Sequence, residues 1–96
     1  MRPSTALDLN RDAVRAAPGR FRLENPRVFG SVLDGTDATG SDLDILIDPL
    51  PGATLLDIGG LQVALEELLG VRVDVLTAGD LPPAIRDRIL AEARPI

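Results

Sequence analysis

The sequence contains no cysteine, no histidine, no tyrosine and no tryptophan. The absence of cysteine excludes disulfides and thiolate metal sites, and the absence of histidine excludes imidazole as a base, an acid or a metal ligand. Because there are only two phenylalanines, little aromatic surface is available for stacking nucleic-acid bases. Any site must therefore be built from carboxylates, hydroxyls, arginine side chains and the backbone.

The charge balance and the lack of long apolar runs argue against two further classes of function. Fifteen acidic and ten basic residues give a net charge of -5, which is the wrong sign for a protein that binds DNA or RNA by neutralising phosphates. No apolar run approaches the roughly 20 residues that cross a bilayer, and the N-terminus does not resemble a secretory signal. We expect a cytoplasmic protein that binds neither nucleic acid nor membrane directly.

The length of the chain sets the size of its core. Of its 96 residues, 45% are hydrophobic, which is enough for one small core. We therefore expect a single domain over residues 1–96. Because so small a domain has little stability in reserve, we also expect a partner or an oligomer to cover apolar surface or to complete a site.

The hydrophobic pattern and the capping residues predict helices near both ends of the chain. The first covers residues 5–17, with Ser4 or Thr5 as its N-cap. The last covers residues 82–93, with Asp80 as its cap and two prolines in its first turn.

The region between these helices, residues 28–77, contains the motifs. A first strand ends at a Gly-Ser turn, a second alternates apolar residues from Leu43 to Ile47, and the segment VRVDVLT forms a third. A helix that begins at Thr54 and ends at Gly70 joins the second strand to the third. This order predicts one crossover connection, whereas the first two strands could pair in either direction.

Two aspartates lie at alternate positions of the second strand. The side chains of Asp42 and Asp44 point to the same face, about 7 Å apart at their Cα atoms. Carboxylates this close repel each other unless one is protonated or a cation lies between them, and Mg²⁺ prefers such oxygen ligands. Read alone, the pair is more typical of solvated residues near a strand end than of a metal site.

A third aspartate, Asp74, lies in the third strand, opposite a face of valines. If the second and third strands are neighbours, three carboxylates meet on one face of the sheet. A two-metal centre for nucleotidyl transfer needs about this set of ligands. The alternative is an ion pair between Asp74 and an arginine, of which Arg72 is the nearest on the same face.

The Gly30-Ser31 turn supplies a second kind of group. A glycine at a strand end allows the backbone to approach a phosphate closely, and the amides of a following helical turn together with the Ser31 hydroxyl can bind its oxygens. By itself, a Gly-Ser dipeptide is typical of an ordinary turn. Ten residues separate Ser31 from Asp42, so the anion turn and the carboxylate strand are adjacent segments that a Mg²⁺-triphosphate could bridge.

Taken together, the stretch FGSVLDGTDATGSDLDILID resembles the nucleotidyltransferases of the DNA polymerase beta superfamily, and above all their minimal nucleotidyltransferase branch. The resemblance covers about residues 28–96. It implies an α/β (α+β) fold, in which a short mixed sheet of three or more strands packs with about three to four helices.

The same resemblance implies roles for the motif residues. Gly30 and Ser31 would bind the nucleotide phosphates, and Asp42, Asp44 and Asp74 would be the catalytic residues that hold two Mg²⁺. The family activity is transfer of AMP from ATP to a hydroxyl. In this branch the acceptor is a tyrosine of a HEPN-domain toxin, and the transferase acts as its antitoxin. Since this chain has no tyrosine, such a transfer must act on a partner.

One departure from the family pattern concerns charge. Relatives often carry arginine soon after the Gly-Ser, whereas this chain has Val32, Leu33 and Asp34. A carboxylate at position 34 would repel a triphosphate, and Arg27 or Arg72 would have to compensate. The alternative hypothesis is therefore a binding module of the same fold that silences its partner by occlusion. A purely structural domain would leave the clustering of three strand aspartates unexplained.

Overall fold

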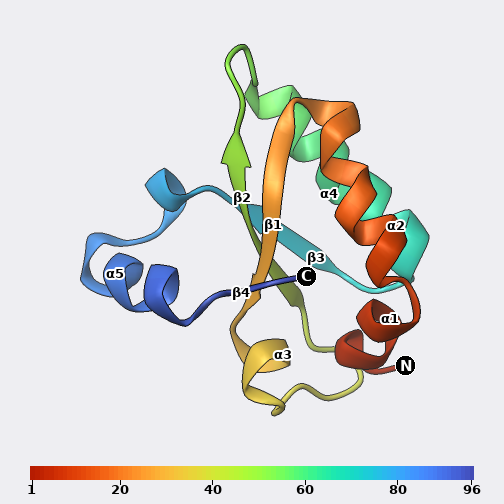
Figure 1. The fold of residues 1–96 in the computed structure, drawn as a ribbon. Coiled ribbons are helices and arrows are strands. Elements are labelled where there is room, and N and C mark those ends of the chain that lie inside the picture. The colour runs from red at the N-terminus through yellow and green to blue at the C-terminus, as the bar shows by residue number, and fades with distance from the viewer.

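The computed structural model describes residues 1–96 and contains a mixed sheet of four strands (Figure 1). The strands are β1 (Leu23–Phe29), β2 (Leu43–Pro49), β3 (Val73–Leu76) and β4 (Arg94–Pro95). In the order β3-β2-β1-β4, β1 pairs antiparallel with β2 and β4, and β2 pairs parallel with β3. The expected mixed sheet is confirmed. β4 was not predicted, because two residues directly after a helix are too few to show a period.

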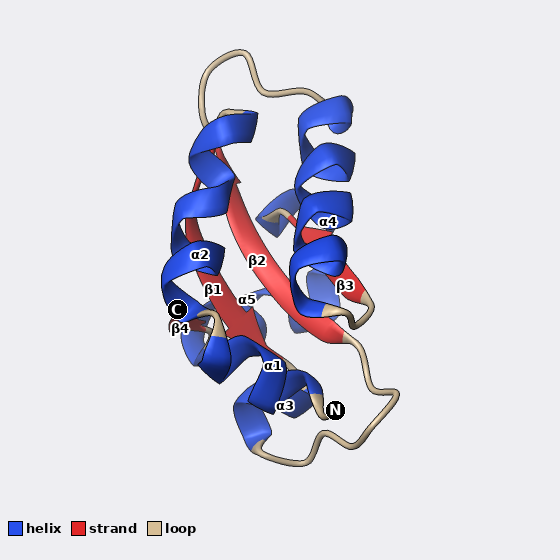
Figure 2. Ribbon diagram, turned by 90° about the vertical axis from the view of Figure 1, so that its right-hand side faces the viewer, coloured by secondary structure: helices blue, strands red, loops and turns tan.

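Helices cover both faces of this sheet. The helical segments are α1 (Pro3–Leu9), α2 (Arg11–Ala16), η1 (Ala17–Phe21), α3 (Ser31–Asp34), α4 (Leu55–Leu69), η2 (Ala78–Asp80) and α5 (Pro83–Glu92), where η1 and η2 are 3₁₀ turns. Figure 2 looks onto the face that α2 and α4 cover, and α5 lies behind the sheet. The expected α/β class is confirmed. None of the helices combines the length and the apolar character needed to cross a membrane.

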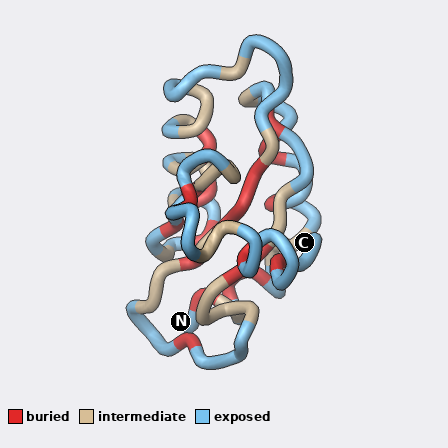
Figure 3. Tube along the Cα trace, turned by 90° about the vertical axis from the view of Figure 1, so that its left-hand side faces the viewer, coloured by how far each residue is buried: buried red, intermediate tan, exposed pale blue.

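The larger of two cores lies between the sheet and the helices α1, α2 and α4. Fifteen buried residues form it. Leu43, Ile45 and Ile47 of β2 are completely buried there against Leu61 and Leu65 of α4. The buried run of β2 appears in Figure 3 as the long red segment through the middle of the molecule. This core explains the alternation in the sequence, because only one face of β2 packs on these helices.

A smaller core of five buried residues holds α5 against the other face of the sheet. It consists of Phe29, Leu46, Leu81, Ile89 and Ala93. It covers only part of this face. Asp44 and Asp74, which lie on the same face one alternation away from Leu46 and Leu76, remain partly or fully exposed. The second face is therefore divided between an apolar part under α5 and a carboxylate part.

The predicted helix over residues 5–17 is in fact two helices. The chain leaves helical geometry at Asn10, where φ is -133° and ψ is 22°, and α2 follows directly. The Asn10 side-chain amide donates a hydrogen bond to the carbonyl of Ala6 (2.8 Å). Asparagine competes with the helical backbone for such bonds, which accounts for the break.

The start of this region also differs from the prediction. α1 begins at Pro3, and its N-cap is Arg2 rather than Ser4 or Thr5. Proline suits the first helical position because its missing N–H would have no partner there. The backbone N–H of Ser4 donates a hydrogen bond to the carboxylate of Asp37 (2.9 Å). A carboxylate that is distant in sequence therefore takes the place of a local cap.

The boundaries of α4 follow the prediction closely. Asp57 accepts a hydrogen bond from the backbone N–H of Thr54 (2.9 Å), as a capping-box residue does. Gly70 ends the helix with φ of 69°, in the left-handed region that favours glycine.

The last helix begins later than predicted. α5 covers Pro83–Glu92, and its N-cap is Pro82 rather than Asp80. Asp80 instead accepts a hydrogen bond from the backbone N–H of Thr77 (2.9 Å) and closes the turn η2. The prediction was wrong because an aspartate cap stabilises a 3₁₀ turn as readily as the helix that follows it.

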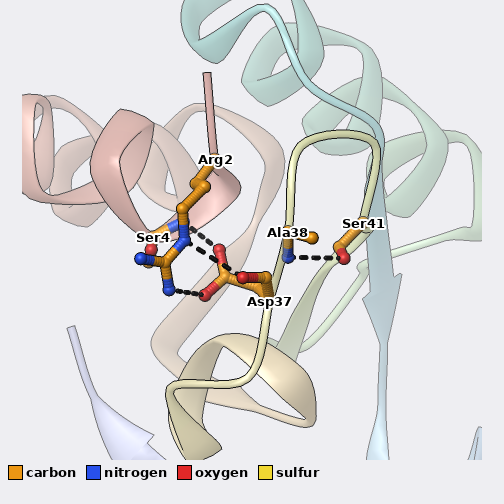
Figure 4. Close-up of polar contacts among 5 residues, drawn as sticks. All are labelled: Arg2, Ser4, Asp37, Ala38 and Ser41. Carbon is orange, nitrogen blue, oxygen red and sulfur yellow. Dashed lines mark hydrogen bonds and ion pairs between the residues drawn. The ribbon is translucent and has the colours of Figure 1, made fainter.

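Asp37 ties the loop before β2 to the N-terminus (Figure 4). Its carboxylate is buried and accepts hydrogen bonds from the guanidinium of Arg2 and from the N–H of Ser4, both at 2.9 Å. Its carbonyl accepts a further bond from Arg2 (3.0 Å). The Ser4 N–H, together with Arg2, lowers the pKa of Asp37 below its ordinary value, although burial opposes this shift. The loop that leads to Asp42 is therefore held in place.

We predict that Asp37→Asn lowers the free energy of unfolding at pH 7, because it removes the charge that Arg2 and Ser4 bind. Since the pKa of Asp37 is lower in the folded chain, the stabilisation is present above the ordinary value of 3.8 and is lost as the pH falls through the lowered pKa. Urea unfolding at pH 7 and at acid pH measures this difference. Asp8→Asn is the control, because it breaks only an exposed pair with Arg11. An equal effect of both substitutions at pH 7 would contradict the prediction.

Candidate active site

Gly30 brings the backbone against a carboxylate. Phe29, the last residue of β1, is the register partner of Asp44 in β2, so the chain turns away directly beside that aspartate. Gly30 has φ of 74° and ψ of -149°, a conformation that is essentially restricted to glycine. A Cβ at this position would overlap Oδ2 of Asp44. Glycine is thus required by both its backbone angles and its neighbour.

Ser31 begins α3 and is partly exposed. α3 has four residues, and its turn is closed by a hydrogen bond from the N–H of Asp34 to the carbonyl of Gly30 (3.0 Å). A single helical turn therefore follows the Gly-Ser dipeptide, as the interpretation of this segment as an anion-binding turn assumes. It directs the chain away from the sheet and leaves the Gly30-Ser31 segment next to Asp44.

Asp44 and Asp74 face each other across β2 and β3. They are register partners in the parallel pair, where neighbouring strands lie about 4.8 Å apart. Asp44 is half-buried and Asp74 is exposed. Burial, followed by repulsion from Asp74 and Asp42, raises the pKa of Asp44 to about 6. Ionised Asp44 is therefore energetically unfavourable unless a cation approaches it.

Asp42 lies just before β2, not within it as predicted, and its carboxylate pairs with Arg72. The Nε of Arg72 lies 2.9 Å from Oδ1 of Asp42, and the same guanidinium donates to the carbonyl of Gly40 (3.0 Å). The sequence left open an ion pair between Arg72 and Asp74. In the structure Arg72 pairs with Asp42 instead, and Asp74 forms no ion pair. Although Arg72 is close, Oδ1 of Asp42 is a buried oxygen that accepts no hydrogen bond.

Asp44 and Asp74 are neighbours on one face of the sheet, and Asp42 lies near enough to repel Asp44, but the three carboxylates are not grouped closely enough to hold a metal ion together. Their surroundings nevertheless fit a hard divalent cation. Oδ1 of Asp42 is paired with Arg72 but accepts no well-formed hydrogen bond. Burial and two neighbouring carboxylates raise the pKa of Asp44, and all three ligands offer oxygen atoms, which Mg²⁺ prefers. The residues that could hold a metal are therefore Asp44 and Asp74, joined by Asp42 when it leaves Arg72.

A pocket of about 430 Å³ opens beside Gly30. Its lining comes from the end of β1, from α3 and from α5, and consists of Phe29, Gly30, Asp34, Arg88, Ile89 and Glu92. The sequence pattern did not single out Arg88, because an exposed arginine on a helix belongs to no motif and its distance from Gly30 depends on the tertiary structure. The pocket places a cation of α5 next to the Gly-Ser turn.

The two arginines considered as compensating charges are both paired. Arg27 forms an ion pair with Asp48 and donates to the carbonyl of Asn25. Arg72 pairs with Asp42. Neither guanidinium is left free for a phosphate in this arrangement.

Residues 20–96 match the family model described as "Nucleotidyltransferase domain". The chain belongs to this nucleotidyltransferase family. A protein of Methanocaldococcus jannaschii, provisionally named a protein adenylyltransferase, is 46% identical over 71 residues, which are 74% of this chain and 76% of that protein. The protein adenylyltransferase MntA of Thermococcus cleftensis is 38% identical over 73 residues, 76% of this chain and 74% of that protein.

Solved structures agree with this assignment. One, provisionally described as a minimal nucleotidyltransferase, matches with a TM-score of 0.86 and 44% identity, covering 100% of this chain and 97% of that one. A second, described as a toxin-antitoxin crystal structure with AMP-PNP, has a TM-score of 0.74 and 18% identity, covering 90% and 71% of the two chains. At 18% identity, the similarity to this second structure shows a shared fold and nothing further. Over its whole length, this nucleotidyltransferase domain therefore has the fold of a minimal nucleotidyltransferase.

We predict that Gly30→Ala destabilises the domain by about 2 kcal/mol, because the new side chain meets both backbone strain and the Asp44 carboxylate. Gly35→Ala is a control with a similar φ of 73° but no atom within 4 Å of the added Cβ, and should cost about 1 kcal/mol. Chemical denaturation measures both. Equal costs would show that the contact with Asp44 is unimportant.

We further predict that Asp44→Asn stabilises the metal-free domain at pH 7. Because the pKa of Asp44 is raised, its protonated form favours folding, and this contribution is lost as the pH rises from 3.8 to about 6. Screening of the partly exposed group reduces the expected gain to about 1 kcal/mol. Denaturation with a chelator present measures it, with the exposed Asp87→Asn as control. A gain that persists at pH 3.5, or no gain at pH 7, would contradict the prediction.

Proposed function

We propose that this nucleotidyltransferase domain transfers AMP from ATP, with Mg²⁺, to a hydroxyl of a partner toxin of the HEPN class, and so acts as its antitoxin. The observation that carries the proposal is the contact of the Gly30 turn with Asp44, since it joins a phosphate-approach turn to the carboxylates of β2 and β3 in one site. Support for a protein acceptor comes from the two relatives named protein adenylyltransferases.

The residues have distinct roles in this proposal. Gly30 keeps side-chain atoms away from the nucleotide phosphates, and Ser31 offers its hydroxyl to their oxygens. Asp42, Asp44 and Asp74 hold the cations, with Asp74 on the acceptor side. Two bound Mg²⁺ would supply charge neutralisation for the attacking hydroxyl and the leaving pyrophosphate. The half-buried position of Asp44 strengthens its interaction with a cation, because water screens it less.

The acceptor must come from another molecule if it is a tyrosine, because this chain has none. The structural neighbour described as a toxin-antitoxin with AMP-PNP motivates a toxin as the partner and an adenine nucleotide as the donor. A short helical protein encoded next to this one is the partner to test.

We predict that the Asp42→Asn, Asp44→Asn double variant reduces AMP transfer to the background level. The experiment incubates the domain with α-labelled ATP, Mg²⁺ and the neighbouring toxin, and follows label on the toxin. A double variant of the exposed Asp8 and Asp12, which lie in α1 and α2, changes the charge equally and should transfer AMP normally. If the wild type labels no verified toxin and binds no ATP, catalysis is disproved.

Occlusion is the second candidate function, and two observations favour it. The carboxylate of Asp34 lines the pocket, where it would repel phosphates. The ion pair with Arg72 occupies Asp42, one of the three proposed metal ligands. The same double variant separates the two functions when toxin activity is measured beside transfer. A folded variant that still neutralises the toxin fully supports occlusion. A folded variant that binds the toxin without neutralising it supports catalysis.

A further inference from the structure

Arg88 of α5 is an unpaired cation beside the Gly30 turn. It is exposed, forms no ion pair or hydrogen bond, and lines the pocket of about 430 Å³ together with Gly30. Glu92 lies one helical turn away, at a spacing that often forms ion pairs, yet the two side chains are not joined. The guanidinium is therefore available to a ligand in the pocket.

The other arginines near the site are already engaged. Arg27 pairs with Asp48, and Arg72 pairs with Asp42. Arg86, two residues before Arg88, donates to the carbonyls of Ala78 and Leu81, both at 2.9 Å. These last bonds join α5 to the turn that precedes it. Arg86 therefore stabilises the local structure, whereas Arg88 makes no such bond.

The small core fixes where Arg88 lies. Its neighbour Ile89 is buried with Phe29 and Leu46 on the sheet, and Ile89 and Phe29 also line the pocket. Because Phe29 directly precedes Gly30, the same contact that holds α5 also holds Arg88 near the turn. Its position thus depends on packing rather than on a local motif.

A phosphate that binds in this pocket needs a positively charged side chain beside it, because the lining also carries carboxylates. Asp34 and Glu92 place two carboxylates in its lining, and Arg88 is the only cation there. The residues after the Gly30-Ser31 turn, Val32 to Asp34, contribute no positive charge. A nucleotide triphosphate beside Gly30 would meet repulsion from Asp34 with no compensating side chain unless Arg88 contacts it.

We propose that Arg88 binds the phosphate chain of the nucleotide, in an inference that rests on the proposed function. A guanidinium can donate two parallel hydrogen bonds to phosphate oxygens, which a single ammonium cannot do in the same geometry. Arg88 thereby supplies from α5 the positive charge that is missing after the Gly-Ser turn.

Binding of ATP with Mg²⁺ to single variants, followed by calorimetry, tests this assignment. Arg88→Ala should weaken ATP binding about tenfold or more, and Arg88→Lys should recover part of the loss. Arg94→Ala is the control, because Arg94 is also exposed and unpaired but lines a different pocket. Asp34→Asn should act in the opposite direction and tighten ATP binding, because it removes the opposing carboxylate.

Adenosine serves as the probe without phosphates. Its affinity should be unchanged by Arg88→Ala, so an equal loss for adenosine and ATP would overturn the phosphate assignment. Circular dichroism establishes that each variant is folded. If wild type binds ATP and transfers AMP but Arg88→Ala has the same affinity and the same KM, this inference fails while the proposed function stands. If wild type binds no ATP, both fail.

Discussion

The antiparallel register of β1 and β2 places Phe29 opposite Asp44, and the rest of the site depends on this pairing. It makes the chain turn at a point where there is no room for a side chain, so Gly30 lies against the Asp44 carboxylate. It also sets Phe29 on the face where α5 packs. One pairing therefore positions the turn, the carboxylate and the helix that carries Arg88.

This arrangement is stable because one face of the sheet is packed in the larger core, whereas the other carries both a small core and the carboxylates. The larger core under α1, α2 and α4 buries one face of β2 completely, and it supplies most of the hydrophobic stabilisation. The other face carries Asp44 in a position where burial and two neighbouring carboxylates oppose its ionisation. A domain of 96 residues can hold such a group because the unfavourable charge is confined to one part of one face, next to a small core that fixes α5.

Much of the fold was accessible from local patterns. The alternation in β2, the crossover through α4 and the limits of that helix at Thr54 and Gly70 follow from periodicity and capping, and the structure has them. Predictions failed where a distant residue or competing local bonds decided the outcome. Asp37 takes the N–H of Ser4, Asn10 breaks the first helix, and Asp80 closes a turn rather than capping α5.

By itself, the sequence determined that Asp44 and Leu46 lie on the face of β2 opposite Leu43, Ile45 and Ile47, and that a Gly-Ser turn precedes this strand, because the direction of a side chain along a strand follows from local periodicity. Only the tertiary structure decided that Asp74 lies opposite Asp44, that Arg72 binds Asp42 rather than Asp74, and that Arg88 lines the same pocket as Gly30. These contacts join residues far apart in the chain, and they form only when strand order and core packing bring the elements together.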